Sequence, residues 1–99
     1  NSMKYITINC TERFFGIEAF KLGKPYYMKK EPENEYDGEA ILVVGEQDVS
    51  YGYVANSVHT VARGTYSAGR IYDTFDDMCK VVPVFIVNKL VIAEVHNNG

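Results

Sequence analysis

The apolar residues of this chain are mainly β-branched or aromatic. Valine and isoleucine together number 19, whereas leucine occurs only 3 times, and there are 8 tyrosines and 5 phenylalanines. Such side chains pack well on a pleated surface, while long helices depend more on leucine and alanine. A length of 99 residues is typical of a single domain. The sequence therefore predicts one small domain that is mainly β.

Alternation of apolar and polar residues indicates where the strands lie. In the first of them, Ile6 and Ile8 share one face. The pair Asn88-Lys89 separates two apolar runs and predicts a two-residue hairpin, with Pro83 at a bend or an edge. We expect strands at residues 4–9, 13–20, 25–31, 40–45, 49–54, 80–87 and 90–95, and a weaker one at 70–74.

The segment after residue 55 predicts a short helix. Asn56 or Ser57 can cap its first turn, and Val58, Val61 and Ala62 then form one apolar stripe. Closing six or seven short strands into a barrel removes exposed strand edges. We therefore expect an OB-like or SH3-like, partly open β-barrel with one or two short helices, one of which covers an opening.

Residues 3–96 are expected to form this single domain. Residues 1–2 precede Met3 and are interpreted as an artificial addition, and residues 97–99 are interpreted as a frayed tail. The longest apolar run, residues 81–87, is far shorter than the ~20 residues that a membrane helix needs. Since the chain also lacks a signal peptide pattern, we expect a cytoplasmic protein with no membrane partner.

The sequence contains no recognisable catalytic or metal-binding motif. His59 is expected on the surface and His96 in the frayed tail, while Cys10 and Cys79 form no CxxC pair. We interpret both cysteines as reduced thiols near the core, with a disulfide between them as the alternative. The acidic residues between 31 and 39 match no calcium loop, although they leave a metal-dependent or hydrolytic activity as a third hypothesis. We expect no enzymatic activity, cofactor or metal.

The stretch from residue 30 to 43 reads KEPENEYDGEAILV and is the most specific part of the chain. Phe15-Gly16-Ile17 precedes it and Tyr51-Gly52-Tyr53-Val54 follows it. This order resembles the HIRAN domain, whose segment Pro-x-Asn-x-Tyr-Asp-x-x-Ala-Ile-x-Val has the same spacing. The resemblance covers about residues 5–95, which is nearly the whole chain.

The same stretch also has a physical interpretation. Asn34 and Asp37 can bond the loop backbone, so that Tyr36 is presented as an aromatic face beside a carboxylate. Such a pair suits a nucleobase and a sugar hydroxyl. The alternative is that Tyr36 packs over the barrel and Asp37 only caps the turn.

The resemblance implies an OB-like barrel without a catalytic centre of its own. Some HIRAN domains belong to helicase-like DNA-remodelling proteins and bind the 3′ end of single-stranded DNA. Their Tyr-Asp pair engages the terminal nucleotide and its 3′ hydroxyl, which implicates Asn34, Tyr36, Asp37 and Tyr53 here. The implied partners are a single-stranded DNA 3′ end and, in relatives, a fused helicase-like or nuclease domain, with a link to DNA repair.

Two features of the sequence weaken this implication. Glu18 and Ala19 stand where DNA-binding members of the family have a basic and an aromatic residue, and the net charge is −3. Phe20 could supply a ring, and Lys29 and Lys30 could contact phosphates. Further cations that could compensate are Lys21, Lys24, Arg63 and Arg70. The alternative function is a protein-interaction or scaffold domain on the same barrel, with DNA binding lost.

Overall fold

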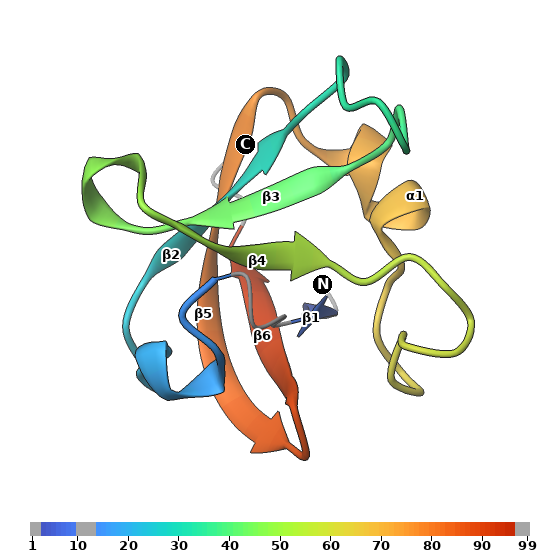
Figure 1. Ribbon diagram of the computed structural model, residues 1–99. Coiled ribbons are helices and arrows are strands. Elements are labelled where there is room, and N and C mark those ends of the chain that lie inside the picture. The colour runs from blue at the N-terminus through green and yellow to red at the C-terminus, as the bar shows by residue number, and fades with distance from the viewer. Residues whose placement is uncertain (1–2, 10–13, 97–99) are drawn as a thin grey trace.

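Six antiparallel strands form a closed barrel in a computed structural model that describes residues 3–9 and 14–96 (Figure 1). Around the barrel the strands follow the order β1-β4-β3-β2-β5-β6, and β6 pairs with β1. The predicted small β-barrel is confirmed, with six strands, and it is closed rather than partly open. The strands are β1 (Lys4–Asn9), β2 (Tyr26–Lys30), β3 (Ile41–Val44), β4 (Ser50–Val54), β5 (Met78–Val87) and β6 (Leu90–His96).

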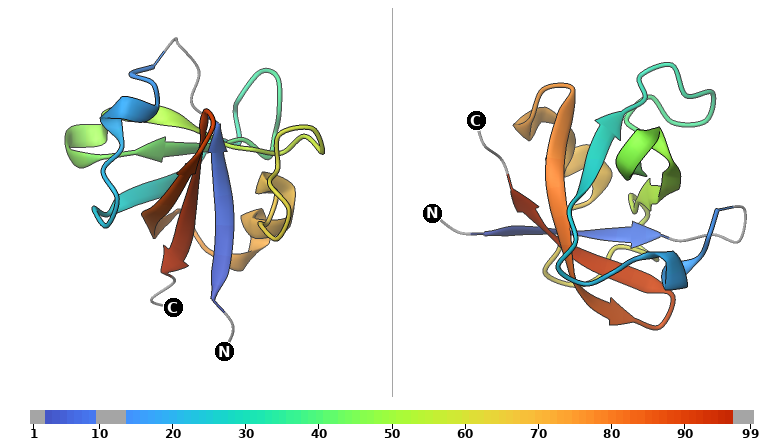
Figure 2. Two further views of the ribbon diagram at one scale, coloured as in Figure 1. Left: turned by 90° about the horizontal axis from the view of Figure 1, so that it is seen from below. Right: turned by 90° about the vertical axis from the view of Figure 1, so that its left-hand side faces the viewer.

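Strand β1 closes the barrel because it pairs with a neighbour on each side. Its pairing with β6 runs from Lys4 opposite Val95 to Asn9 opposite Leu90, whereas its pairing with β4 involves only Ile8 and Asn9. Figure 2 shows β1 and β6 side by side. The predicted alternation holds for Ile6 and Ile8, which are both fully buried.

The interior of the barrel is filled by alternate residues of the strands. Every second side chain along a strand points inward, as expected for a sheet with one buried face. Branched aliphatic residues dominate, which is the feature that predicted a β fold. The fully buried members of the core are Ile6, Ile8, Tyr26, Met28, Ile41, Val43, Val81, Val91 and Ala93, together with Ile71 from outside the strands.

An aromatic cluster packs the chain before β2 onto the barrel. Tyr26 is fully buried, and its ring centroid lies 4.9 Å from that of Phe20 and 5.2 Å from that of Tyr51. Its hydroxyl accepts from the Lys21 N–H and donates to the Ala19 carbonyl. Because the hydroxyl has both partners, this tyrosine can be buried without the cost of an unsatisfied polar group.

The predicted strand at residues 13–20 is wrong over its described part. Residues Ile17–Ala19 form a 3-10 turn, and Gly16 before them has φ 76° and ψ −178°. This combination of angles is essentially restricted to glycine, and it lies between a turn at Phe14 and Phe15 and the 3-10 turn. The apparent alternation from Phe15 to Ala19 therefore does not form one face of a strand.

The predicted helix after residue 55 is also wrong. The Ser57 carbonyl accepts from the N–H groups of Thr60 and Val61, which makes a single turn that does not continue. The N–H of Ala62 instead donates to the hydroxyl of Thr7, which is fully buried on β1. The apolar stripe does not exist either, because Val58 is 88% exposed.

The only α-helical turn in the described ranges lies further along the chain. Helix α1 (Ala68–Ile71) begins at Ser67, whose hydroxyl accepts from the Arg70 N–H, and a 3-10 turn (Tyr72–Thr74) follows it directly. The weak strand predicted at residues 70–74 is therefore wrong. Ala68 and Ile71 are buried in the core, so the apolar residues of this segment reflect packing of a short helix against the barrel.

The hairpin of β5 and β6 is confirmed, and its tip extends beyond the rest of the barrel (Figure 1). Asn88 has φ 56°, as expected in a two-residue turn, and the register shifts between Pro83 and Phe85. Strand β2 pairs only with the first part of β5, from Met78 to Val81. The later residues 84–87 are all exposed, at 38–58%.

None of the helices in the described ranges is long and apolar enough to cross a membrane.

Gly52 offers a stringent test of the barrel packing. A Cβ at this position would lie 2.8 Å from the Asn9 carbonyl oxygen and 3.2 Å from a methyl group of Ile8. Because the backbone of β1 would have to move, we expect Gly52→Ala to lower the free energy of unfolding by about 1–3 kcal/mol. Urea denaturation measures the loss. Gly38→Ala is the matched control, since a methyl group added there would have no neighbouring atom within 4 Å, and an equal loss in both variants would contradict this account.

Candidate nucleic-acid interface

Asn34 organises the loop between β2 and β3. Its side-chain oxygen accepts from the N–H groups of Tyr36 and Asp37, at 2.9 and 3.1 Å. Its amide nitrogen donates to a carboxylate oxygen of Glu31, at 3.1 Å. Both ends of one side chain are therefore used to fix the backbone of the Tyr-Asp pair, as expected for an Asx-type turn.

Glu31 connects this loop to the neighbouring strand β4. The carboxylate oxygen that accepts from Asn34 also accepts from the hydroxyl of Tyr53, at 2.7 Å. The backbone closes the base of the loop, because the Glu31 N–H donates to the Ala40 carbonyl. Sequence reasoning treated Glu31 only as part of an acidic stretch. The three-residue spacing between Glu31 and Asn34 could have indicated their hydrogen bond. No local pattern could have indicated the bond between Glu31 and Tyr53, which are 22 positions apart.

Asp37 connects the other side of the loop to the segment that leads into α1. One of its carboxylate oxygens accepts from the Glu39 N–H, at 2.9 Å, and the other accepts from the side-chain amide of Asn56, at 3.3 Å. The Asn56 oxygen in turn accepts from the Gly69 N–H. Figure 1 shows the loop and α1 as neighbours. The sequence suggests only a helix cap at Asn56, so its bridging role is a finding of the structure.

The braced loop borders a surface depression of about 330 Å³. Tyr36 stands at its edge with 93% of its surface exposed, while Asn34 and Asp37 are half-buried. The alternative in which Tyr36 packs over the barrel is therefore wrong. Four of the predicted site residues meet here, and the complete lining is Asn34, Glu35, Tyr36, Asp37, Ala40, Tyr53 and Val54.

The other three predicted site residues are not part of this depression. Phe20 is 5% exposed and belongs to the aromatic cluster around Tyr26, so its ring has no face open for stacking. Lys30 donates to the Phe75 carbonyl at 2.6 Å, and its ammonium lies 4.5 Å from the centroid of the Tyr72 ring. Lys29 lies 3.6 Å from a carboxylate oxygen of Asp48.

Both lysines therefore already have partners within the protein. The contacts of Lys30 join β2 to the turn after α1, which is a structural role. The ion pair of Lys29 is exposed and contributes little to stability. Lys21 and Lys24 precede β2, whereas the Tyr-Asp loop follows it, so they lie toward opposite ends of that strand.

No family model, no curated protein and no solved structure matches this chain.

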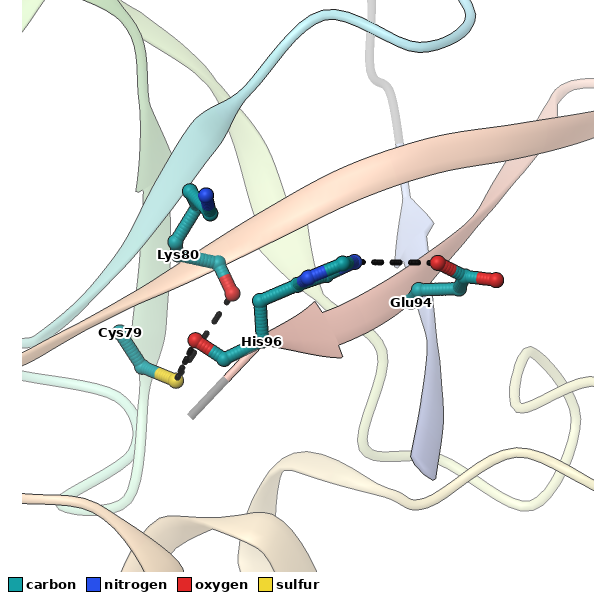
Figure 3. A network of polar contacts seen from close by, with 4 residues as sticks. All are labelled: Cys79, Lys80, Glu94 and His96. Atoms are coloured by element: carbon teal, nitrogen blue, oxygen red, sulfur yellow. Dashed lines mark hydrogen bonds and ion pairs between the residues drawn. The ribbon is translucent and has the colours of Figure 1, made fainter. Parts of the chain in front are cut away.

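A cysteine, a histidine and a carboxylate come together where β5 meets β6 (Figure 3). The prediction that His96 lies in a frayed tail is wrong, because His96 is the last residue of β6. Its Nε2 lies 3.0 Å from a Glu94 oxygen. The Cys79 sulfur lies 3.8 Å from the backbone carbonyls of Lys80 and His96. The contacts of the thiol are thus with backbone carbonyl groups, whereas activation of a cysteine requires a neighbouring base.

The remaining candidates for catalysis and metal binding have simple structural descriptions. Cys79 is a free thiol, as expected, and Cys10, its partner in the alternative disulfide, lies outside the described residues, as do residues 1–2 and 97–99. His59 is exposed, as predicted. Within residues 3–9 and 14–96, there is no group of three or more His, Cys, Asp or Glu that could hold a metal ion.

The buried thiol makes a testable contribution to stability at alkaline pH. Burial raises the pKa of the Cys79 thiol, so the folded protein favours the neutral form. This contribution is complete below the pKa of the unfolded thiol and is lost as the pH rises through the higher pKa of the folded one. We expect wild type to lose more stability than Cys79→Ala between neutral and alkaline pH. Urea denaturation in reductant measures both, and parallel profiles would contradict the expectation.

Proposed function

We propose that this chain is a non-catalytic module, similar to HIRAN domains, that binds the 3′ end of single-stranded DNA. The observation that carries this proposal is the exposed ring of Tyr36 beside the carboxylate of Asp37, on a loop braced by Asn34, Glu31 and Asn56. Tyr36 leaves 93% of its surface in water although its backbone is held in place by hydrogen bonds. Binding of a ligand would explain why an aromatic side chain is presented in this way.

The chemistry of the pair fits a terminal nucleotide. A base can stack on the Tyr36 ring, because every base offers a π-face. Each carboxylate oxygen of Asp37 accepts one hydrogen bond from the protein, whereas a carboxylate offers about four acceptor positions. A free 3′ hydroxyl could therefore donate to Asp37 without displacing its partners. A 3′ phosphate would instead bring negative charge against it.

This function requires no chemistry within the module. Recognition of a strand end would direct an attached or associated helicase-like or nuclease domain to its substrate, in DNA repair or remodelling. The acidic residues of the loop lower the expected affinity for any polyanion. We therefore expect weak binding that decreases as the salt concentration rises.

The proposal is tested with a fluorescently labelled single-stranded oligonucleotide in two forms, with a 3′ hydroxyl and with a 3′ phosphate. Fluorescence polarisation should show tighter binding of the hydroxyl form. Tyr36→Ala should weaken that binding by about 1–3 kcal/mol, or ~5- to 150-fold, because one stacked base is lost.

Phe15→Ala is the matched control, since it removes another exposed aromatic ring, 65% exposed, outside the loop. Equal affinity for the two oligonucleotide forms would refute end recognition. Equal weakening by both variants would refute the assignment to Tyr36.

A protein-interaction role is the second candidate, and the tip of β5 favours it. Residues 84–87 place four consecutive exposed apolar side chains on a stretch of strand that β2 does not cover. Exposed Glu18 and half-buried Ala19, in place of a basic and an aromatic residue, support the same alternative. A strand from a partner could pair along this open edge.

Under this alternative, wild type binds no oligonucleotide even at low salt. Phe85→Asp should abolish capture of a partner protein in a pull-down from cell extract, because it places a charge in the apolar contact. Tyr36→Ala should leave that capture intact. Retention of the partner by Phe85→Asp would exclude the β5 tip as the interface.

A further inference from the structure

A second depression, of about 360 Å³, lies beside α1. Asn56 lines it and donates a hydrogen bond to Asp37, which lines the Tyr-Asp depression. The loop after β4 and the start of α1 form the rest, and α1 lies next to the β2–β3 loop in Figure 1. Its lining is Asn56, Val58, Val61, Ala62, Arg63, Gly64, Thr65, Ser67 and Arg70.

Two arginines give this second depression a positive charge. Arg63 and Arg70 are both exposed, and neither forms an ion pair with a carboxylate of the described residues. The Arg70 guanidinium lies 4.5 Å from the centroid of the Tyr66 ring. Such a contact occupies a face of the guanidinium and leaves its in-plane N–H groups available, which suits a phosphate.

The distribution of charge indicates in which direction a bound strand would continue. The β2–β3 loop carries Glu33 and Glu35 on its exposed surface, which repel phosphates. Exposed Glu39 differs from them, because one of its carboxylate oxygens lies 2.9 Å from where a Cβ of Gly69 would be, at the start of α1. Lys29 and Lys30 have partners within the protein, and Lys21 and Lys24 lie toward the far end of β2. By contrast, Arg63 and Arg70 form no ion pair within the described part of the chain, and they line a depression that Asn56 links to Asp37 by a hydrogen bond.

We propose that Arg63 and Arg70 bind the phosphates of the nucleotides that precede the terminal one, so that a single strand crosses from the Tyr-Asp depression over Asn56 to the arginine depression. This inference rests on the proposed function and adds to it the direction of the strand. It also replaces the lysines near β2, which the sequence favours, as the source of phosphate contacts.

The test compares two double variants that remove the same charge. The probe is a short labelled oligothymidylate with a 3′ hydroxyl, titrated at several salt concentrations. For Arg63→Ala with Arg70→Ala, we expect the slope of log Kd against log salt to fall by about 1.4, because each lost phosphate contact on a single strand removes about 0.7. Lys21→Ala with Lys24→Ala should keep the slope of wild type.

Conservative substitution separates charge from packing, since Arg70 contacts Tyr66. Arg63→Lys with Arg70→Lys should retain most of the salt dependence, and Arg63→Ala alone should lower the slope by about 0.7. Thermal unfolding of every variant checks that the fold persists. If the arginine and lysine double variants lose affinity equally, the inference is overturned.

The outcomes distinguish this inference from the function on which it rests. If Tyr36→Ala weakens binding and the arginine variants do not, the proposed end recognition stands and the strand direction is refuted. If the arginine variants weaken binding but 3′ hydroxyl and 3′ phosphate forms bind equally, the phosphate contacts stand and end recognition is refuted. If wild type binds neither form at low salt, both are refuted.

Discussion

The whole structure depends on β1 pairing with neighbours on both of its edges. This pairing closes the barrel, and it also anchors the long connection between β4 and α1. The Ala55 N–H donates to the Thr7 carbonyl, the Ala62 N–H to the Thr7 hydroxyl, and the Tyr66 N–H to the Tyr5 carbonyl. Asn56 is therefore held near a fixed strand, and through Asn56 so is Asp37. The position of the candidate interface therefore depends on the hydrogen bonds between β1 and the connection from β4 to α1.

Charge is separated on this small surface in a way that the net value of −3 conceals. Asp37 of the acidic loop hydrogen-bonds Asn56, and Asn56, Arg63 and Arg70 line the neighbouring depression. Of the loop carboxylates, that of Glu39 lies next to Gly69, at the start of α1. A ligand that spans both sides would need a neutral, hydroxyl-bearing end and an anionic body. The terminus of a nucleic-acid strand has this character, whereas a free phosphate or a uniformly charged polyanion does not. Under the proposed function, the two depressions together would be more selective than either would be alone.

The strands were predictable where neighbouring residues determine them. Alternation placed β1 and the inward-facing Tyr26 and Met28, and Asn88-Lys89 placed the hairpin. Prediction failed where a distant partner or a special backbone angle decided the outcome. Gly16 adopts a backbone conformation that the predicted strand does not allow, and the buried Thr7 hydroxyl accepts from an N–H group that a helix at residues 57–63 would have used. In the site, the loop residues were predictable from their motif, but the bonds of Glu31 and Asn56 join segments far apart in sequence.

The order in which the strands can form follows from the closing pair. Hairpin β5–β6 needs only a two-residue turn, whereas β1 pairs with β6 across more than 80 residues of chain. During synthesis, β1 must therefore wait with an unpaired edge until residues 90–96 have left the ribosome. Loop closure over such a distance is slow compared with local pairing. We expect the apolar side chains of Ile6 and Ile8, which are fully buried in the folded barrel, to stay accessible to other apolar surfaces during that interval.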